Sequence, residues 1–221
     1  MVKAIIFDMD GVITDSEPLW ADAVEEQFRL HGIVIKHNEE YNEFVIKQVR
    51  GRSQRHAINA EKKKYHLQGS YQQLLNQRLR ILFSIFDKKL TAVPGTIPLI
   101  KKLYRAGYPL AIASSSPRRA INYILNRYHL KKYFKVKVSG DDFKKSKPHP
   151  EIFLQCAKLL KAKPRDMLVF EDSISGIQAA HRAKMKCIAV RQPYTPKKYL
   201  TTTIFVYKNL NQISLAMLNK L

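Results

Sequence analysis

Short apolar runs alternate with amphipathic stretches along most of the chain, and together they predict a series of strands and helices. The runs typical of buried strands lie at 3–7, 108–113, 135–138, 166–170 and 186–190, with a last, edge strand expected at 203–206. Caps and turn residues between these runs bound helices expected at 96–105, after a turn at Pro94-Gly95, and at 117–128, 150–160, 173–183 and 209–218. Strands that alternate with helices predict a parallel sheet covered on both faces, a doubly wound, Rossmann-like α/β fold.

The stretch 15–90 interrupts this alternation, because it contains no strand signal. Its helices are expected from Ser16 to about His31, and at 39–48, 53–66 and 71–86. Pro18 suits the first turn of the first of these helices, and Gly32 suits its end. The pattern predicts an inserted α-helical cap domain at 15–90, with a catalytic core made of 1–14 and 91–221.

Polar and charged side chains gather where the predicted strands end. Asp8 and Asp10 follow the first strand, Ser114 and Ser115 the second, and Glu171 and Asp172 the fourth, while Lys147 follows the third by a loop that also carries Asp141 and Asp142. The carboxyl ends of parallel strands meet at one edge of a sheet, where ligands bind. Several carboxylates in one cleft repel each other unless a hard cation such as Mg²⁺ joins them, and the lysine and serines favour a phosphate group as the second guest.

Each of these signals has a plainer interpretation on its own. The paired aspartates are compatible with a solvated turn, Ser116 with a helix cap before Pro117, and Glu171 with a cap of the helix that begins at Ser173. Their joint order and position at successive strand ends favour a single catalytic site.

At this point the sequence resembles a known family. The segments Asp8-Met-Asp-Gly-Val, Ser114, Lys147-Pro-His-Pro and Glu171-Asp-Ser-x-x-Gly176 are similar to the four motifs of the haloacid dehalogenase superfamily, in that order. The resemblance covers the whole chain, and the helical insert resembles the subclass with an α-helical cap. Within it, Asp15-Ser-Glu-Pro-Leu-Trp20 is similar to the β-phosphoglucomutase-like branch, closest to its sugar-phosphate phosphatases, including 2-deoxyglucose-6-phosphate phosphatase.

The resemblance implies a role for each motif residue. Asp8 is expected to be the nucleophile that becomes an aspartyl phosphate, and Asp10 the general acid and base. Asp8, the backbone carbonyl of Asp10, Asp172 and Glu171 are the expected Mg²⁺ ligands, with Glu171 acting directly or through water. Ser114, Ser115 and Lys147 are expected to bind the phosphoryl group. The resemblance therefore implies a Mg²⁺-dependent hydrolase of a small phosphomonoester, a sugar phosphate above all.

Departures from the family pattern bear on the alternatives. Asp10 argues against dehalogenation, and no lysine of the cap is identified as the Schiff-base residue of the phosphonatases. A phosphohexomutase remains the second reading, although Trp20 and Gln54 stand where mutases of this branch have histidine and arginine, with Arg55 adjacent. A non-catalytic, basic binding protein is a third reading, which the intact motifs disfavour.

The segment around Gly51 is the part of the cap expected to face the site. Arg50 and Arg52 suit a second anionic group or sugar hydroxyls, although a solvated basic loop explains them equally well. Trp20 has two interpretations, stacking on a sugar or packing between cap helices, and packing is favoured. The linkers near 14–17 and 88–94 are the expected hinges of cap opening.

Charge and composition add limits on partners. Lysine and arginine total 39 against 18 acidic residues, a net charge of +21, but 15–90 carries only +3 of it. The lysines are scattered and form no stripe with interleaved aromatics, so nucleic acid is not expected as a partner. The apolar runs are too short for a membrane-spanning helix. We further expect the protein to be a monomer. Cys156 and Cys187 lie in apolar patterns, which predicts buried thiols in a cytoplasmic, reducing compartment.

Overall fold

The computed structural model describes residues 1–193, 203 and 205–221, and its centre is a six-stranded parallel sheet. The strands follow the spatial order β3-β2-β1-β4-β5-β6, with the first strand of the sequence near the middle. Their bounds are Ala4–Phe7 for β1, Leu110–Ser114 for β2, Val136–Ser139 for β3, Met167–Glu171 for β4, Lys186–Val190 for β5 and Phe205–Tyr207 for β6. The α/β, Rossmann-like fold expected from the sequence is confirmed.

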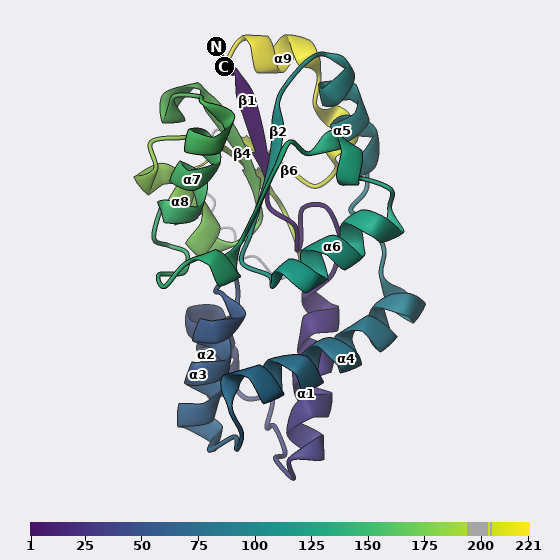
Figure 1. Ribbon diagram of the computed structural model, residues 1–221, viewed down its shortest axis with the longest axis vertical. Coiled ribbons are helices and arrows are strands. Elements are labelled where there is room, and N and C mark those ends of the chain that lie inside the picture. Colours follow the sequence, from purple (N-terminus) through teal and green to yellow (C-terminus); the bar gives the residue numbers. More distant parts are fainter. Residues whose placement is uncertain (194–202, 204) are drawn as a thin grey trace.

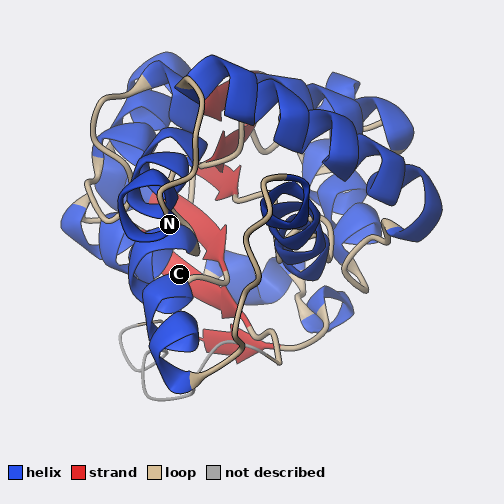
Figure 2. Ribbon diagram, turned by 90° about the horizontal axis from the view of Figure 1, so that it is seen from below, coloured by secondary structure: helices blue, strands red, loops and turns tan. Residues whose placement is uncertain are grey.

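Helices cover both faces of the sheet because side chains of a strand point alternately to its two sides. In β1, Ile5 and Phe7 pack in one apolar cluster, and Ala4 and Ile6 pack in the other. The first cluster includes side chains of α5 (Thr96–Arg105) and α6 (Arg118–Arg127). The second includes side chains of α7 (Glu151–Leu160) and α8 (Ile174–Arg182), which lie on the opposite side of the sheet (Figure 1). Figure 2 shows the strands between these layers of helices.

The helices of the stretch 15–90 lie beyond the carboxyl ends of the strands, at the lower end of Figure 1. They are α1 (Glu17–Leu30), α2 (Glu39–Phe44), α3 (Gln54–Tyr65) and α4 (Tyr71–Lys89), with a π-helical turn at Val45–Val49 after α2. Ser70 caps α4 in a reciprocal capping box with Gln73. The ring of Phe83 on α4 stacks on Tyr123 of α6, with ring centres 4.7 Å apart, so α4 also contacts a helix of the sheet layer.

The chain enters and leaves this helical segment at one place. Thr14 forms an isolated antiparallel bridge with Ala92, and the amide of Asp15 donates to the carbonyl oxygen of Thr91 over 3.0 Å. The amide of Val93 donates to the carbonyl oxygen of Ile13 over 3.0 Å. These backbone bonds hold the two linkers side by side below the sheet.

Two expectations for the C-terminal region change. The continuous helix expected at 209–218 is wrong: a 3₁₀ turn spans Leu210–Gln212 and a short helix, α9, spans Leu215–Asn219. Asn209 and Ser214 each accept a hydrogen bond from a following backbone amide, so two local caps divide the segment, with Ile213 extended between them. The edge strand expected at 203–206 is observed at Phe205–Tyr207, and residue 204 lies outside the described residues.

Both cysteines are buried and form no disulfide, as expected. None of the helices in the described residues is long and apolar enough to cross a membrane.

Candidate active site

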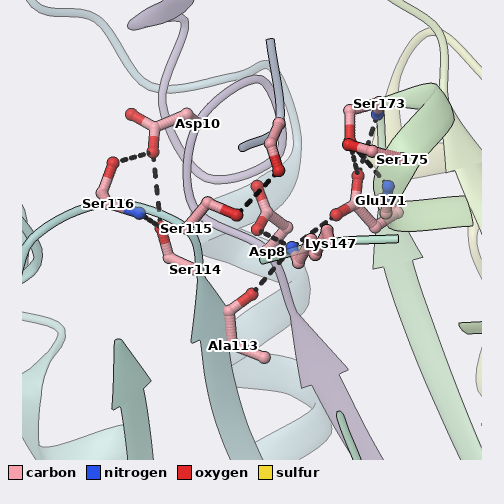
Figure 3. Close-up of polar contacts among 12 residues, drawn as sticks. Asp8, Asp10, Ala113, Ser114, Ser115, Ser116, Lys147, Glu171, Ser173 and Ser175 are labelled. Atoms are coloured by element: carbon pink, nitrogen blue, oxygen red, sulfur yellow. Dashed lines mark hydrogen bonds and ion pairs between the residues drawn. The ribbon is translucent and has the colours of Figure 1, made fainter. Parts of the chain in front are cut away.

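The carboxyl ends of β2, β1 and β4 bring together the side chains that the motifs single out (Figure 3). Asp8 directly follows β1, Ser114 ends β2 and Glu171 ends β4. In the register of the sheet, Phe7 of β1 lies beside Ile112 on one side and Phe170 on the other. The three ends therefore align, and the residues that follow them converge at one point.

Lys147 reaches this point from the loop after β3, and its ammonium group is almost completely buried. Its Nζ donates to Asp8 Oδ1 and to Glu171 Oε1, each over 2.6 Å, and to the carbonyl oxygen of Ala113 over 3.1 Å. All three of its protons thus have acceptors. Burial alone lowers the pKa of Lys147, but the carboxylates of Asp8 and Glu171 outweigh it and hold the pKa above its ordinary value.

Three buried carboxylates, those of Asp8, Glu171 and Asp172, lie with ligand atoms within 4.8 Å of one another. Burial raises the pKa of Asp8 well above its ordinary value, although Lys147 acts against this, and burial followed by the charge of Glu171 raises the pKa of Asp172. One ammonium group therefore faces three carboxyl groups in a dry site. Such an excess of hard oxygen donors suits a divalent cation of the Mg²⁺ type.

The oxygens of Glu171 are already occupied by protein donors. Its Oε1 accepts from Lys147, and its Oε2 accepts from the amides of Asp172 and Ser173, each over 2.8 Å, and from Ser173 Oγ over 3.0 Å. Ser173 also caps α8 by accepting from the amide of Gly176, as expected. Glu171 is consequently better suited to holding Lys147 and the turn after β4 than to direct contact with a cation.

Asp10 lies apart from this cluster, and its side chain is held by donors from two directions. Its Oδ1 accepts from Ser16 Oγ over 2.6 Å and from the indole nitrogen of Trp20 over 2.9 Å. Its Oδ2 accepts from Ser116 Oγ over 2.5 Å and from Ser114 Oγ over 3.4 Å. Trp20 is buried, as the packing interpretation expects, but its indole also orients Asp10.

The three serines after β2 have different surroundings. Ser114 Oγ is buried and accepts from the amide of Ser116 over 3.0 Å. Ser115 Oγ donates to the carbonyl oxygen of Gly51 over 2.8 Å. Ser115 and Ser116 line a cavity that also includes Asp8 and Asp10, whereas Ser114 is not among the residues that line it. Ser116 makes no cap for α6, so the helix-cap interpretation of this residue is not observed.

A cavity of about 50 Å³ lies between the strand ends and the helical segment. The strand side contributes Asp8, Asp10, Ser115, Ser116, Asp172 and Ser173, and the helical side contributes Glu17, Trp20, Val49, Arg50, Gly51, Arg52 and Gln54. All the residues that the sequence assigned to the cap side of the site therefore line this cavity.

The segment at Gly51 contacts the strand side directly. Gly51 has a φ of 70°, and a Cβ atom there would lie 2.6 Å from Ser173 Oγ and closer still to Ser175 Oγ. The guanidinium of Arg52 donates to the carbonyl oxygens of Lys147, over 2.9 Å, and Lys47, over 3.3 Å. Arg52 thus ties the helical segment to the loop of Lys147 through the peptide backbone.

Sequence reasoning did not assign Ser116, Ser173, Glu17 or Gln54 to the site, although all four line the cavity, the last two on its helical side. Glu17 was expected only to belong to a helix start, but burial raises its pKa to about 7 although Arg50, 3.7 Å away, opposes the shift. Gln54 was noted only as a departure from the mutases, and no local pattern marks either residue as part of the site. Asp141 and Asp142 instead bond Arg118 and stay outside the acidic cluster.

Comparison with known proteins supports the same conclusion. Residues 2–184 match the family of haloacid dehalogenase-like hydrolases, and the chain belongs to this family. It is 32% identical over 187 residues to a phosphorylated carbohydrates phosphatase of Thermotoga maritima, covering 85% of this chain and 84% of the relative. It is 28% identical over 193 residues to hexitol phosphatase B of Escherichia coli, covering 87% and 85%.

A solved structure of β-phosphoglucomutase from Clostridium difficile superimposes with a TM-score of 0.83 at 26% identity, covering 100% of this chain and 96% of that one. The structure of CbbY from Rhodobacter sphaeroides with phosphate superimposes with a TM-score of 0.86 at 23% identity, covering 99% and 100%, and supports the fold. The resemblance drawn from the motifs is confirmed, and so is the assignment to the hydrolases of this family.

Proposed function

We propose that this protein is a Mg²⁺-dependent phosphatase that hydrolyses a small phosphomonoester, in particular a sugar phosphate. The observation that carries the proposal is the buried ammonium group of Lys147 between Asp8 and Glu171, at a cavity that also contains Asp10. A carboxylate attacks a phosphate dianion only where positive charge offsets their repulsion, and Lys147 lies at the attacking group. The similarity to the two named phosphatases of sugar and hexitol phosphates supports the substrate class.

In this proposal Asp8 is the nucleophile. A bond forms between its carboxylate oxygen and phosphorus while the bond from phosphorus to the alcohol oxygen breaks, and Asp10 gives a proton to that oxygen. Asp10 then takes a proton from the water that hydrolyses the aspartyl phosphate. The bonds from Ser16, Trp20 and Ser116 orient Asp10 for this exchange. Ser115 and Ser116, which line the cavity, would donate hydrogen bonds to the phosphoryl group.

The Mg²⁺ ion would be held by Asp8 and Asp172, with the backbone carbonyl of Asp10 and with Glu171 through water. When bound, it would supply positive charge to the phosphoryl oxygens. Glu171 contributes its charge and keeps Lys147 in place, since both of its oxygens accept bonds from the protein.

The helical segment 15–90 is proposed to act as a cap over this cavity. Gly51 and Arg52 contact the strand side, which is the arrangement of a closed cap. Movement about 14–17 and 88–94 would release these contacts and exchange substrate for product.

The test is a phosphate-release assay over sugar phosphates, polyol phosphates, nucleotides and p-nitrophenyl phosphate, with Mg²⁺ and with chelator. The variant Asp8→Asn is expected to abolish release, because it removes the attacking carboxylate, and to unfold at the same denaturant concentration as the wild type or a higher one, because it removes a buried charge. Release that persists in Asp8→Asn, or in chelator, contradicts the proposal.

A phosphohexomutase is the second candidate, favoured by the similarity to the β-phosphoglucomutase structure. It would use the same aspartyl phosphate and return the phosphoryl group to the sugar. Analysis of the same reactions for sugar-phosphate isomers separates the two, since a phosphatase produces orthophosphate and a mutase accumulates an isomer.

A further inference from the structure

A buried arginine in the helical segment, Arg78 on α4, is the centre of a hydrogen-bond network that ends at the site cavity. Its side chain is fully buried, and its guanidinium makes five hydrogen bonds, as many as it has N–H groups. Nε and Nη2 donate to Gln27 Oε1 over 2.9 and 2.6 Å, and Nη1 donates to Gln54 Oε1 over 3.0 Å. Nη1 and Nη2 also donate to the two carboxylate oxygens of Glu61, over 3.4 and 2.5 Å.

The network joins α1, α3 and α4, but burying its charged groups, an arginine and a glutamate, has an unfavourable desolvation free energy. Well-packed apolar residues often give equal or greater stability. The apolar side chains of α1 and α4 already pack in the main core cluster. Unlike apolar packing, the hydrogen bonds of this network fix the orientation of a polar side chain, that of Gln54.

Gln54 is the side chain whose direction matters at the site. It lines the site cavity and also an adjoining cavity of about 60 Å³ walled mainly by apolar and aromatic side chains, among them Trp20 and Phe28. Its carboxamide oxygen accepts a hydrogen bond from the guanidinium of Arg78, which lines neither cavity. Because a guanidinium offers donors only, the amide cannot flip without placing its NH₂ group against another donor. The Nε2 group of Gln54 is therefore the end presented to the cavities, and it makes no hydrogen bond to the described residues.

We infer that Gln54 is a specificity-determining residue that donates a hydrogen bond to the alcohol part of the substrate, and that Arg78 is the residue that positions it. The phosphoryl end of the substrate faces Asp8, and Gln54 lies across the cavity on the helical side, where the leaving alcohol extends. The preferred substrates are phosphate esters whose alcohol carries a hydrogen-bond acceptor, such as a hydroxyl or carbonyl oxygen. This inference deepens the proposed phosphatase function and rests on it.

The test compares sorbitol phosphate, which offers hydroxyl acceptors, with phenyl phosphate, whose leaving group offers none beyond the ester oxygen. In Gln54→Leu the ratio of kcat/KM for sorbitol phosphate to that for phenyl phosphate is expected to fall about tenfold, the value of one hydrogen bond, mainly through KM. Gln72→Leu, which changes an exposed glutamine on α4, is the matched control and is expected to leave the ratio as in the wild type.

The role of Arg78 is tested by replacing it together with Glu61, so that no unpaired charge remains buried. The double variant Arg78→Met/Glu61→Met removes the ion pair together, which keeps the fold more readily than either single change. It is expected to lower the same ratio as Gln54→Leu does, and to lower it no further when combined with Gln54→Leu. A residue that only stabilises the fold would lower kcat/KM for both substrates alike and add to the effect of Gln54→Leu.

The outcomes separate the two proposals. Phosphate release from neither ester by the wild type overturns the phosphatase function, and this inference with it. A ratio that is unchanged in Gln54→Leu overturns only the inference, since the change of the ratio on substitution is independent of the different leaving-group reactivities of the two esters. An additive effect of the Arg78 and Gln54 variants overturns the positioning role of Arg78.

Discussion

Replacing Gly51 by alanine tests how closely the helical segment must approach the strand ends. The new Cβ would press on Ser173 Oγ and Ser175 Oγ. Ser173 cannot turn away easily, because its hydroxyl caps α8 and bonds Glu171. The Gly51 segment must therefore move instead, and this movement breaks the bonds from Ser115 and Arg52 to the backbone.

The expected magnitude follows from these contacts. A positive φ costs an alanine about 1 kcal/mol, and each of the two lost hydrogen bonds is worth about 1 kcal/mol. The first cost affects stability wherever the glycine lies, while the other two oppose only the closed arrangement. Together the two bonds amount to about 2 kcal/mol, or a fall of about 30-fold in kcat/KM.

Gly32 supplies a matched control. Its φ is 72°, close to that of Gly51, but a Cβ there would meet nothing within 4 Å. Gly32→Ala is therefore expected to lose about 1 kcal/mol in urea denaturation with kcat/KM as in the wild type. Adding Ser175→Ala to Gly51→Ala removes the closest obstacle and is expected to restore part of the activity. Wild-type kcat/KM in Gly51→Ala, or an equal loss in Gly32→Ala, would refute this reasoning.

Two further predictions concern acids that line the cavity. Asp172→Ala is expected to weaken Mg²⁺ binding at least tenfold, so that the ion no longer raises the Tm, whereas Asp142→Ala, at the exposed acid paired with Arg118, is expected to keep the Mg²⁺ effect on Tm. For Glu17, the native pKa of about 7 lies above the ordinary value of 4.5, so the native state holds a proton that the unfolded chain has lost, and stability falls as pH rises through this window. The fall amounts to up to about 3 kcal/mol, and urea denaturation of Glu17→Gln is expected to lack it; a variant curve as steep as that of the wild type would contradict the assignment.

The centre of the sheet was predictable because β1, β2 and β4 are buried on both faces and therefore appear as continuous apolar runs. The position of the motif residues followed from topology, since parallel neighbours end at one edge. The prediction of one continuous final helix was wrong because the side chains of Asn209 and Ser214 accept hydrogen bonds from nearby backbone amides. The spacing of apolar residues contains no information about these local hydrogen bonds.

The helical side of the site was less accessible to sequence reasoning. Glu17 has the pattern of an exposed first-turn acid, but in the fold it is partly buried at the cavity between the helical segment and the strand ends. Gln54 obtains its direction from Arg78, which is distant in sequence, and no spacing rule joins them. Among consecutive serines, the backbone turn after β2 determines that Ser115 and Ser116 reach the cavity while Ser114 does not.

The antiparallel bridge between Thr14 and Ala92 has a consequence for how such a protein changes over time. Because the two linkers lie side by side, a longer, shorter or different set of helices can be inserted there without stretching the sheet. Asp8 and Glu171 are held by Lys147 and by backbone amides after β4, so they would keep their positions during such an exchange. The wall opposite them would be replaced, whereas the donors to Asp10 from Ser16 and Trp20 would have to be retained. The architecture thus allows the chemistry of bond cleavage and the choice of leaving alcohol to evolve, or to be grafted between proteins, separately.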